Sequence, residues 1–84
     1  MPTVTQVHGI PLWLLRDYLQ DLGGEALTEE VLDGEGWQAR LQVLPPAQIG
    51  SLRVGRVQVE IEAEQDVLDR FLPAFERKTL RAGA

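Results

Sequence analysis

The sequence predicts an α+β domain of two layers, in which an antiparallel meander sheet carries two helices on one face. Three observations lead to this prediction. Apolar residues recur at helical spacing near both ends of the chain, while residues 37–43 and 51–63 alternate between apolar and polar positions. The 84 residues suffice for one modest core. We therefore expect a single domain, 1–84, with the element order β-α-β(4)-α.

The first two predicted elements are a strand and a helix. Residues 3–9 are rich in β-branched side chains and predict the strand. Pro11 fits the first turn of the helix, because a backbone N–H at that position has no helical partner. The apolar residues that follow form one stripe at helical spacing: Leu12, Leu15, Tyr18, Leu19 and Leu22. Gly23 and Gly24 predict a left-handed C-cap.

The middle of the chain predicts two strands, the first of them ambiguous. Thr28 is a candidate cap for a short helical turn. The hairpin-like sequence DGEG at 33–36 instead favours a strand over 26–32, which is the interpretation we adopt. Residues 37–43 alternate strictly and predict a strand with one buried face and one solvated face.

The apolar alternation then changes phase. Leu52 and Val54 occupy even positions, whereas the apolar residues of 57–63 occupy odd positions. A two-residue turn at Gly55-Arg56 resolves the change, since Gly-X is typical of a type II′ turn. The pattern therefore predicts a hairpin over 51–63.

The last predicted element is a helix that Asp66 caps. Its apolar residues have the i, i+3, i+4, i+7 spacing of a helix face: Leu68, Phe71, Leu72 and Phe75. Pro73 lies inside this pattern and predicts a kink or a break, because proline lacks the N–H that a helix interior uses.

Composition excludes several function classes. A net charge of −5 argues against nucleic-acid binding, which requires a basic surface, and against anionic membranes. Without cysteine the chain has no disulfide, thiol nucleophile or cysteine-bound metal. No apolar run approaches the ~20 residues that span a bilayer. The first nine residues lack signal-peptide features, so we expect a cytoplasmic protein.

Two compositional biases bear on the source of the protein. The absence of asparagine and cysteine fits a thermophile. The seven arginines against one lysine are not the general signal of hyperthermophiles, and a GC-rich genome explains them as well.

Few residues are candidates for catalysis or metal binding. His8 is the only histidine and Ser51 the only serine, so a Ser51–His8–Asp triad is formally available, but no nucleophile-elbow sequence surrounds the serine. Glu60, Glu62 and Glu64 share one strand face, where a hard cation would find oxygen ligands. A solvated strand face has the same pattern, and no second cluster completes a shell. We expect no catalytic residue, no cofactor and no metal.

Trp13 is the most unusual residue of the predicted first helix. It falls on the polar arc between Asp17 and Gln20, where an apolar side chain requires cover. Either the N-terminal segment or the C-terminal tail covers it, or it contacts another protein, as tryptophan often does in interfaces. Trp13 and Asp17 are therefore our candidate interaction residues. Exposed strand edges also make a homodimer plausible.

Three stretches of the sequence resemble a known family. Residues 11–24 (PLWLLRDYLQDLGG), residues 45–64 (PPAQIGSLRVGRVQVEIEAE) and the closing helix look like the domain that follows the ubiquitin-like domain in MoaD-related sulfur-carrier proteins of Thermus-type bacteria. The resemblance covers 8–83 and implies a TBP-like β-α-β(4)-α fold. It implies no catalytic residue, and it links the chain to molybdopterin or sulfur-carrier chemistry by association only.

These observations favour a non-catalytic protein-interaction module with a partner of the sulfur-carrier type. No ubiquitin-like domain accompanies the resemblance, and the sequence ends Gly83-Ala84 rather than Gly-Gly, so we expect no thiocarboxylate-forming tail. The alternative is a small-ligand binder whose site lies between sheet and helices, where a kink at Pro73 would open a gap.

Overall fold

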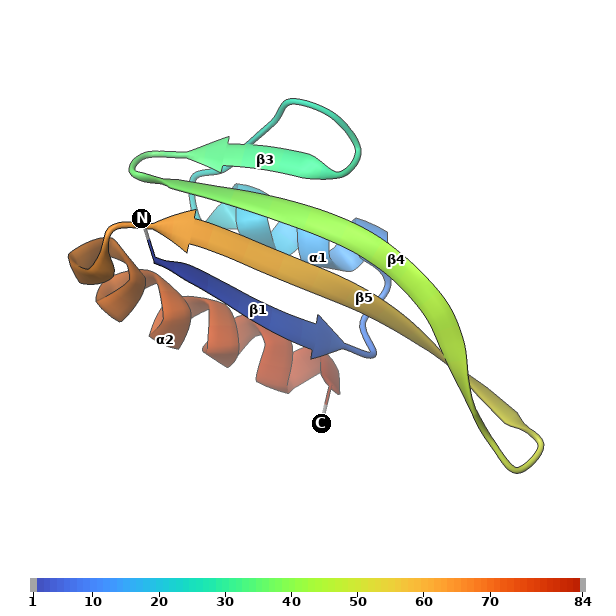
Figure 1. Ribbon diagram of the computed structural model, residues 1–84. Coiled ribbons are helices and arrows are strands. Elements are labelled where there is room, and N and C mark those ends of the chain that lie inside the picture. The colour runs from blue at the N-terminus through green and yellow to red at the C-terminus, as the bar shows by residue number, and fades with distance from the viewer. Residues whose placement is uncertain (1, 84) are drawn as a thin grey trace.

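A computed structural model describes the backbone of residues 2–83 and the side chains of residues 2–80. Its elements are β1 (Thr3–His8), α1 (Leu12–Asp21), β2 (Glu25–Ala26), β3 (Val31–Gly34), β4 (Trp37–Ile49), β5 (Leu52–Ala63) and α2 (Gln65–Gly83). The strands form one antiparallel sheet in the order β1-β5-β4-β3-β2, and both helices cover the same face (Figure 1). The predicted α+β class and element order are confirmed.

The core lies between this sheet face and the two helices. Alternate residues of β4 and β5 point toward the helices and are buried, as the period-two pattern predicts. The helices meet them with the predicted stripes, of which Leu15 and Leu19 come from α1 and Leu68, Phe71 and Phe75 from α2. The sheet contributes Leu32, Trp37, Ala39, Leu41, Val57, Val59, Ile61 and Ala63.

The sequence prediction holds at the end of α1 and differs from the structure in α2. The C-cap of α1 is confirmed: Gly23 has φ 99°, and the N–H groups of Gly23 and Gly24 donate to Gln20 O and Leu19 O in a Schellman arrangement. Helix α2 begins at Gln65, so Asp66 lies in its first turn rather than at the N-cap. The helix also continues through Pro73 without a break.

The strand predicted over 26–32 is wrong in its extent. Residues 27–30 are bends that separate the two-residue β2 from β3. The Thr28 hydroxyl accepts hydrogen bonds from the N–H groups of Glu30 and Val31, both at 3.1 Å, so it stabilises a turn and not a helix. The hairpin expected at 33–36 is present, and Gly34 pairs with Trp37.

The turn predicted at Gly55-Arg56 is also wrong. Strand β5 runs through both residues, and the turn lies at Gly50-Ser51, where Ile49 pairs with Leu52. Gly50 has φ 60°, which suits the first position of a type II′ turn. The Gly-X signature occurs twice in this segment, and the earlier turn allows β4 and β5 to pair along almost their whole length.

The far part of the β4–β5 ribbon projects beyond the rest of the sheet (Figure 1). Pairing of β1 with β5 ends at Val57, so residues 44–56 form a two-stranded ribbon that we call the arm. A β-bulge lies in β4 between Leu44 and Ala47. The Arg56 guanidinium holds it by donating from Nε and Nη2 to the Pro45 carbonyl, at 3.1 and 2.8 Å.

Candidate functional site

Trp13 is an exposed aromatic side chain near the start of α1. Its side chain is 62% exposed. Among the described residues, therefore, neither the N-terminal segment nor the C-terminal helix covers it, as one of our two interpretations required. Asp17 lies one helical turn further on and is exposed as well. The structure therefore places both predicted interaction residues side by side on the solvent face of α1.

An apolar notch of about 480 Å³ lies directly before Trp13 in the chain, between the start of α1 and the base of the arm. Its apolar lining consists mainly of Ile10, Pro11, Leu12, Val43, Leu44 and Pro46. Val43 points to the helix side of the sheet, but α1 begins too late to cover it, so it is 62% exposed. Arg56 is the one charged residue among those that line the notch.

Sequence reasoning found Trp13 but missed the notch. Its two walls come from residues more than 30 positions apart, and no local pattern joins them. The sequence does carry one signal, the run of four apolar residues at 43–46, which interrupts the alternation of β4 where its buried part ends.

The arm carries a second apolar surface, on the sheet face that points away from the helices. Pairing places Ala47 opposite Val54 and Ile49 opposite Leu52, so these four residues share one face of the ribbon, which we call the arm face. Ile49 and Leu52 are each 66% exposed and Val54 39%. Gln48 and Arg53 pair on the opposite face of the arm.

The bulge creates this arrangement. In β4, apolar residues occupy odd numbers from Trp37 to Val43 and again at Ala47 and Ile49, and the extra residue at the bulge turns Ala47 and Ile49 to the face away from the helices. Strand β5 has no extra residue, yet its apolar residues change from odd to even numbers beyond Val57. Both strands therefore place their apolar residues on the arm face, and this explains the phase change in the sequence.

Among the described residues His8 forms no hydrogen bond or ion pair with a serine or a carboxylate, although Glu76 and Thr79 line the same surface depression. Its Nε2 lies 2.9 Å from Gln6 Oε1, and its ring packs edge-on against Phe75 with the centroids 5.7 Å apart. Burial lowers the pKa of His8 below its usual value of 6.5. Ser51 lies at the tip of the arm, six residues along β5 from the partner of His8, or about 20 Å at 3.3 Å per residue. The structure rules out a direct Ser51–His8 contact.

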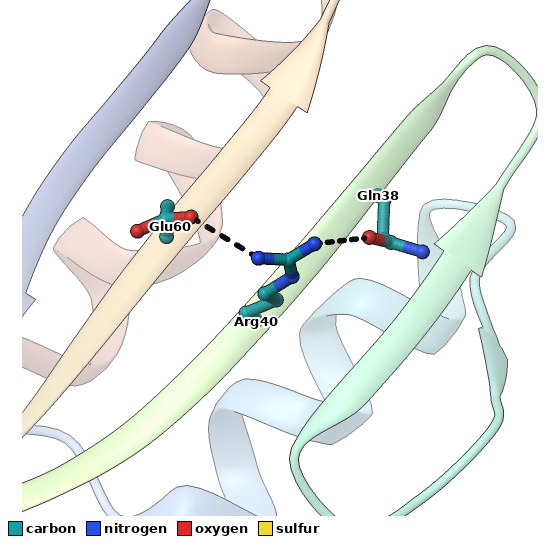
Figure 2. Close-up of polar contacts among 3 residues, drawn as sticks. All are labelled: Gln38, Arg40 and Glu60. Carbon is teal, nitrogen blue, oxygen red and sulfur yellow. Dashed lines mark hydrogen bonds and ion pairs between the residues drawn. The ribbon is translucent and has the colours of Figure 1, made fainter.

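The carboxylates of β5 lie on the polar part of the outer sheet face. Glu60 forms an ion pair with Arg40 at 3.8 Å, and Arg40 Nη2 donates to Gln38 Oε1 at 3.4 Å (Figure 2). Glu62 is paired in the sheet with Gln38 and Thr3, which offer no further carboxylate. Within residues 2–83 no group of three or more His, Asp or Glu side chains is placed to hold a metal ion.

No helix within residues 2–83 is both long enough and apolar enough to cross a membrane. Helix α2 continues through Pro73, and Leu68 and Phe75 on its two sides are buried against the sheet.

Fold and surface together define a class: a two-layer α+β domain with an exposed tryptophan on its first helix and an apolar notch at the start of that helix. The chain belongs to the family of archaeal MoaD-like proteins, whose sequence profile matches residues 3–84. The MoaD-related part of the resemblance is thereby confirmed. No curated protein matches the chain.

Proposed function

We propose that this MoaD-like protein is a non-catalytic interaction module that binds a protein of the sulfur-carrier type through Trp13 and the notch. The observation that carries the proposal is the 62% exposure of Trp13, which directly follows Leu12, a residue of the notch lining. Aromatic side chains beside such concavities supply much of the binding energy in protein interfaces. The family membership supports the choice of partner.

The chemistry of the remaining candidates supports a binding role over catalysis. General acid–base or nucleophilic catalysis needs a nucleophile and a base within hydrogen-bond reach. His8 contacts Gln6 and Phe75, it shows no hydrogen bond to Glu76 or Thr79 of the same depression, and Ser51 is remote from it. The TBP-like assignment, the thermophilic source and the cytoplasmic location stay predictions of the sequence.

Tryptophan fluorescence provides a direct test. Trp37 is 6% exposed and Trp13 62%, so the variant Trp37→Phe leaves Trp13 as the one fluorophore of this type, in a solvated position. Titration with a ubiquitin-like sulfur-carrier protein is expected to shift its emission to shorter wavelength. Unchanged emission together with no binding by calorimetry would exclude a sulfur-carrier protein as the partner.

A pair of matched variants tests the site. Trp13→Ala is expected to weaken binding by about 2 kcal/mol or more, as is usual for an interface tryptophan. Leu27→Ala removes a different exposed side chain, 56% exposed and outside the notch, and is expected to leave the affinity unchanged. Equal affinities for wild type and Trp13→Ala would exclude Trp13 from the interface.

A small apolar ligand is the second candidate for the notch, because a volume of about 480 Å³ lies within the range of ligand sites. Such a ligand would raise the melting temperature of the protein, and Val43→Glu would abolish the rise. A screen of apolar compounds without any stabilising hit would end this alternative.

A further inference from the structure

We infer that the arm face is the interface of a homodimer, in which the arm of each protomer lies on the acidic end of the other. The inference goes beyond the proposed function and rests on residues other than Trp13. Its basis is the inverted alternation of the arm, the distribution of charge along the chain and the elongated shape of the molecule.

The arm face has the composition of a covered surface. Its four residues are aliphatic, and the three large ones are exposed: Ile49, Leu52 and Val54. The rest of the outer sheet face is mixed: it carries Gln38, Arg40 and Glu60, and its apolar residues Val7 and Val31 stand apart from one another on β1 and β3. A two-stranded ribbon that concentrates aliphatic residues on its outer face is typical of an interaction surface rather than of a solvated hairpin.

Charge indicates what covers the arm. Residues 36–59 contain three arginines and no acidic residue, whereas all thirteen carboxylates lie elsewhere in the chain. Seven of them lie at the end opposite the arm, in the turn 33–36 and in residues 60–70, together with one arginine. The molecule therefore has a basic arm and an acidic far end, and a second copy offers the charge that each end lacks.

The acidic far end also offers an apolar seat. A shallow depression of about 550 Å³ lies there, between the β3–β4 turn and the start of α2. Its lining includes Leu22, Val67, Phe71 and Ala74, with Glu35 and Arg70 as its charged members. The aliphatic arm face thus has an apolar counterpart on the same chain, as a self-complementary interface requires.

The shape of the molecule allows both contacts at once. Its extents are 42 × 24 × 22 Å, with the arm at one end of the long dimension (Figure 1). Two copies that lie side by side in opposite directions bring each arm to the far end of the other, with a two-fold axis between them. Arg53 lies on the opposite face of the thin ribbon, within about one Debye length of the covered surface, so its charge acts on the carboxylates there.

Analytical ultracentrifugation of the full chain tests the inference. The wild type is expected to be dimeric in the upper micromolar range, and Leu52→Asp is expected to raise the dissociation constant at least tenfold. Leu80→Asp, a change at an equally exposed leucine outside the arm, is the control and leaves the dimer intact. A wild-type chain that is monomeric up to millimolar concentration, or equal effects of the two variants, would overturn the inference.

A charge exchange tests the orientation of the two copies. Arg53→Glu and Glu35→Arg each weaken their own homodimer, because each brings like charges near both contacts, Arg53 acting from the uncovered face of the thin ribbon. An equimolar mixture of the two variants restores association, since every contact then joins opposite charges. A mixture that associates no better than its components would exclude the antiparallel arrangement. Trp13→Ala leaves the dimer unchanged, so failure of this inference and failure of the proposed function are distinguishable.

Discussion

The body of the sheet and the arm use the same two strands in opposite ways. In the body, the odd-numbered apolar residues of β5 from Val57 to Ala63 face the helices and are buried. In the arm, Leu52 and Val54 face away from the helices and are exposed. Alternation therefore tells which residues share a face, but the elements opposite that face decide whether it becomes core or surface.

The largest expected effect is the difference in folding stability between a leucine truncated in the body and one truncated in the arm. Leu19 is fully buried in the body, so Leu19→Ala is expected to lower the free energy of unfolding by about 2–5 kcal/mol. Leu52 is 66% exposed in the arm, and Leu52→Ala is expected to change the stability of the monomer by less than about 0.5 kcal/mol. Urea denaturation in dilute solution measures both. Similar losses for the two leucines would show that the arm face packs within one chain.

The next largest effect on stability is expected from adding a methyl group at Gly34 in the body, with Gly55 in the arm for comparison. At Gly34, an added Cβ would lie 2.0 Å from Trp37 Cε2, because the indole packs over the glycine of the opposite strand. Gly34→Ala is expected to cost about 1–3 kcal/mol of stability, as overpacked sites usually do.

Gly55 is the matched control in the arm, where an added Cβ meets nothing within 4 Å. Gly55→Ala is expected to be neutral or slightly stabilising, because alanine restricts the unfolded chain. Thermal unfolding of the two variants compares them. A clear loss of stability in Gly55→Ala would instead support the turn that the sequence predicts at Gly55-Arg56.

A smaller, local effect is expected at the bulge. Arg56→Ala removes both hydrogen bonds to the Pro45 carbonyl, and their net contribution is about 1 kcal/mol. The change loosens the arm without unfolding the body. Hydrogen exchange is expected to accelerate at the amides of the arm and to stay unchanged in the core part of β5. Uniform acceleration over the sheet would mean that arm and body unfold together.

The smallest effect concerns pH. Burial lowers the pKa of His8 below 6.5, so the folded state takes up a proton less readily than the unfolded state. The stability associated with His8 is complete above its usual pKa and is lost as the pH falls below that value. His8→Gln is expected to flatten this part of the pH profile of the melting temperature between about pH 7 and pH 5. Parallel profiles for both proteins would contradict this role.

The sequence was sufficient for the elements whose apolar side meets the core. The stripes of α1 and α2 and the strand from Trp37 to Val43 were predicted because burial imposes a period on them. It failed at residues 27–30 and at Gly55-Arg56. Among the described residues the arm face meets no helix, so its pattern follows no core, and the bulge at Pro45-Pro46 changes the face on which the later odd-numbered residues of β4 lie.

The candidate site was likewise predictable only in part. Trp13 stood out because it breaks the pattern of its own helix, and the structure leaves it exposed. The notch and the arm face depend on pairings between segments far apart in the sequence, so no helical or strand period predicts them.

Intermolecular NOEs in a mixture of labelled and unlabelled chains provide the most direct test of what covers the arm. The antiparallel dimer predicts contacts from the methyl groups of Ile49 and Leu52 in one copy to the rings of Trp37 and Phe71 in the other. Intermolecular contacts that leave out the arm, or a concentrated sample without any, would contradict the account.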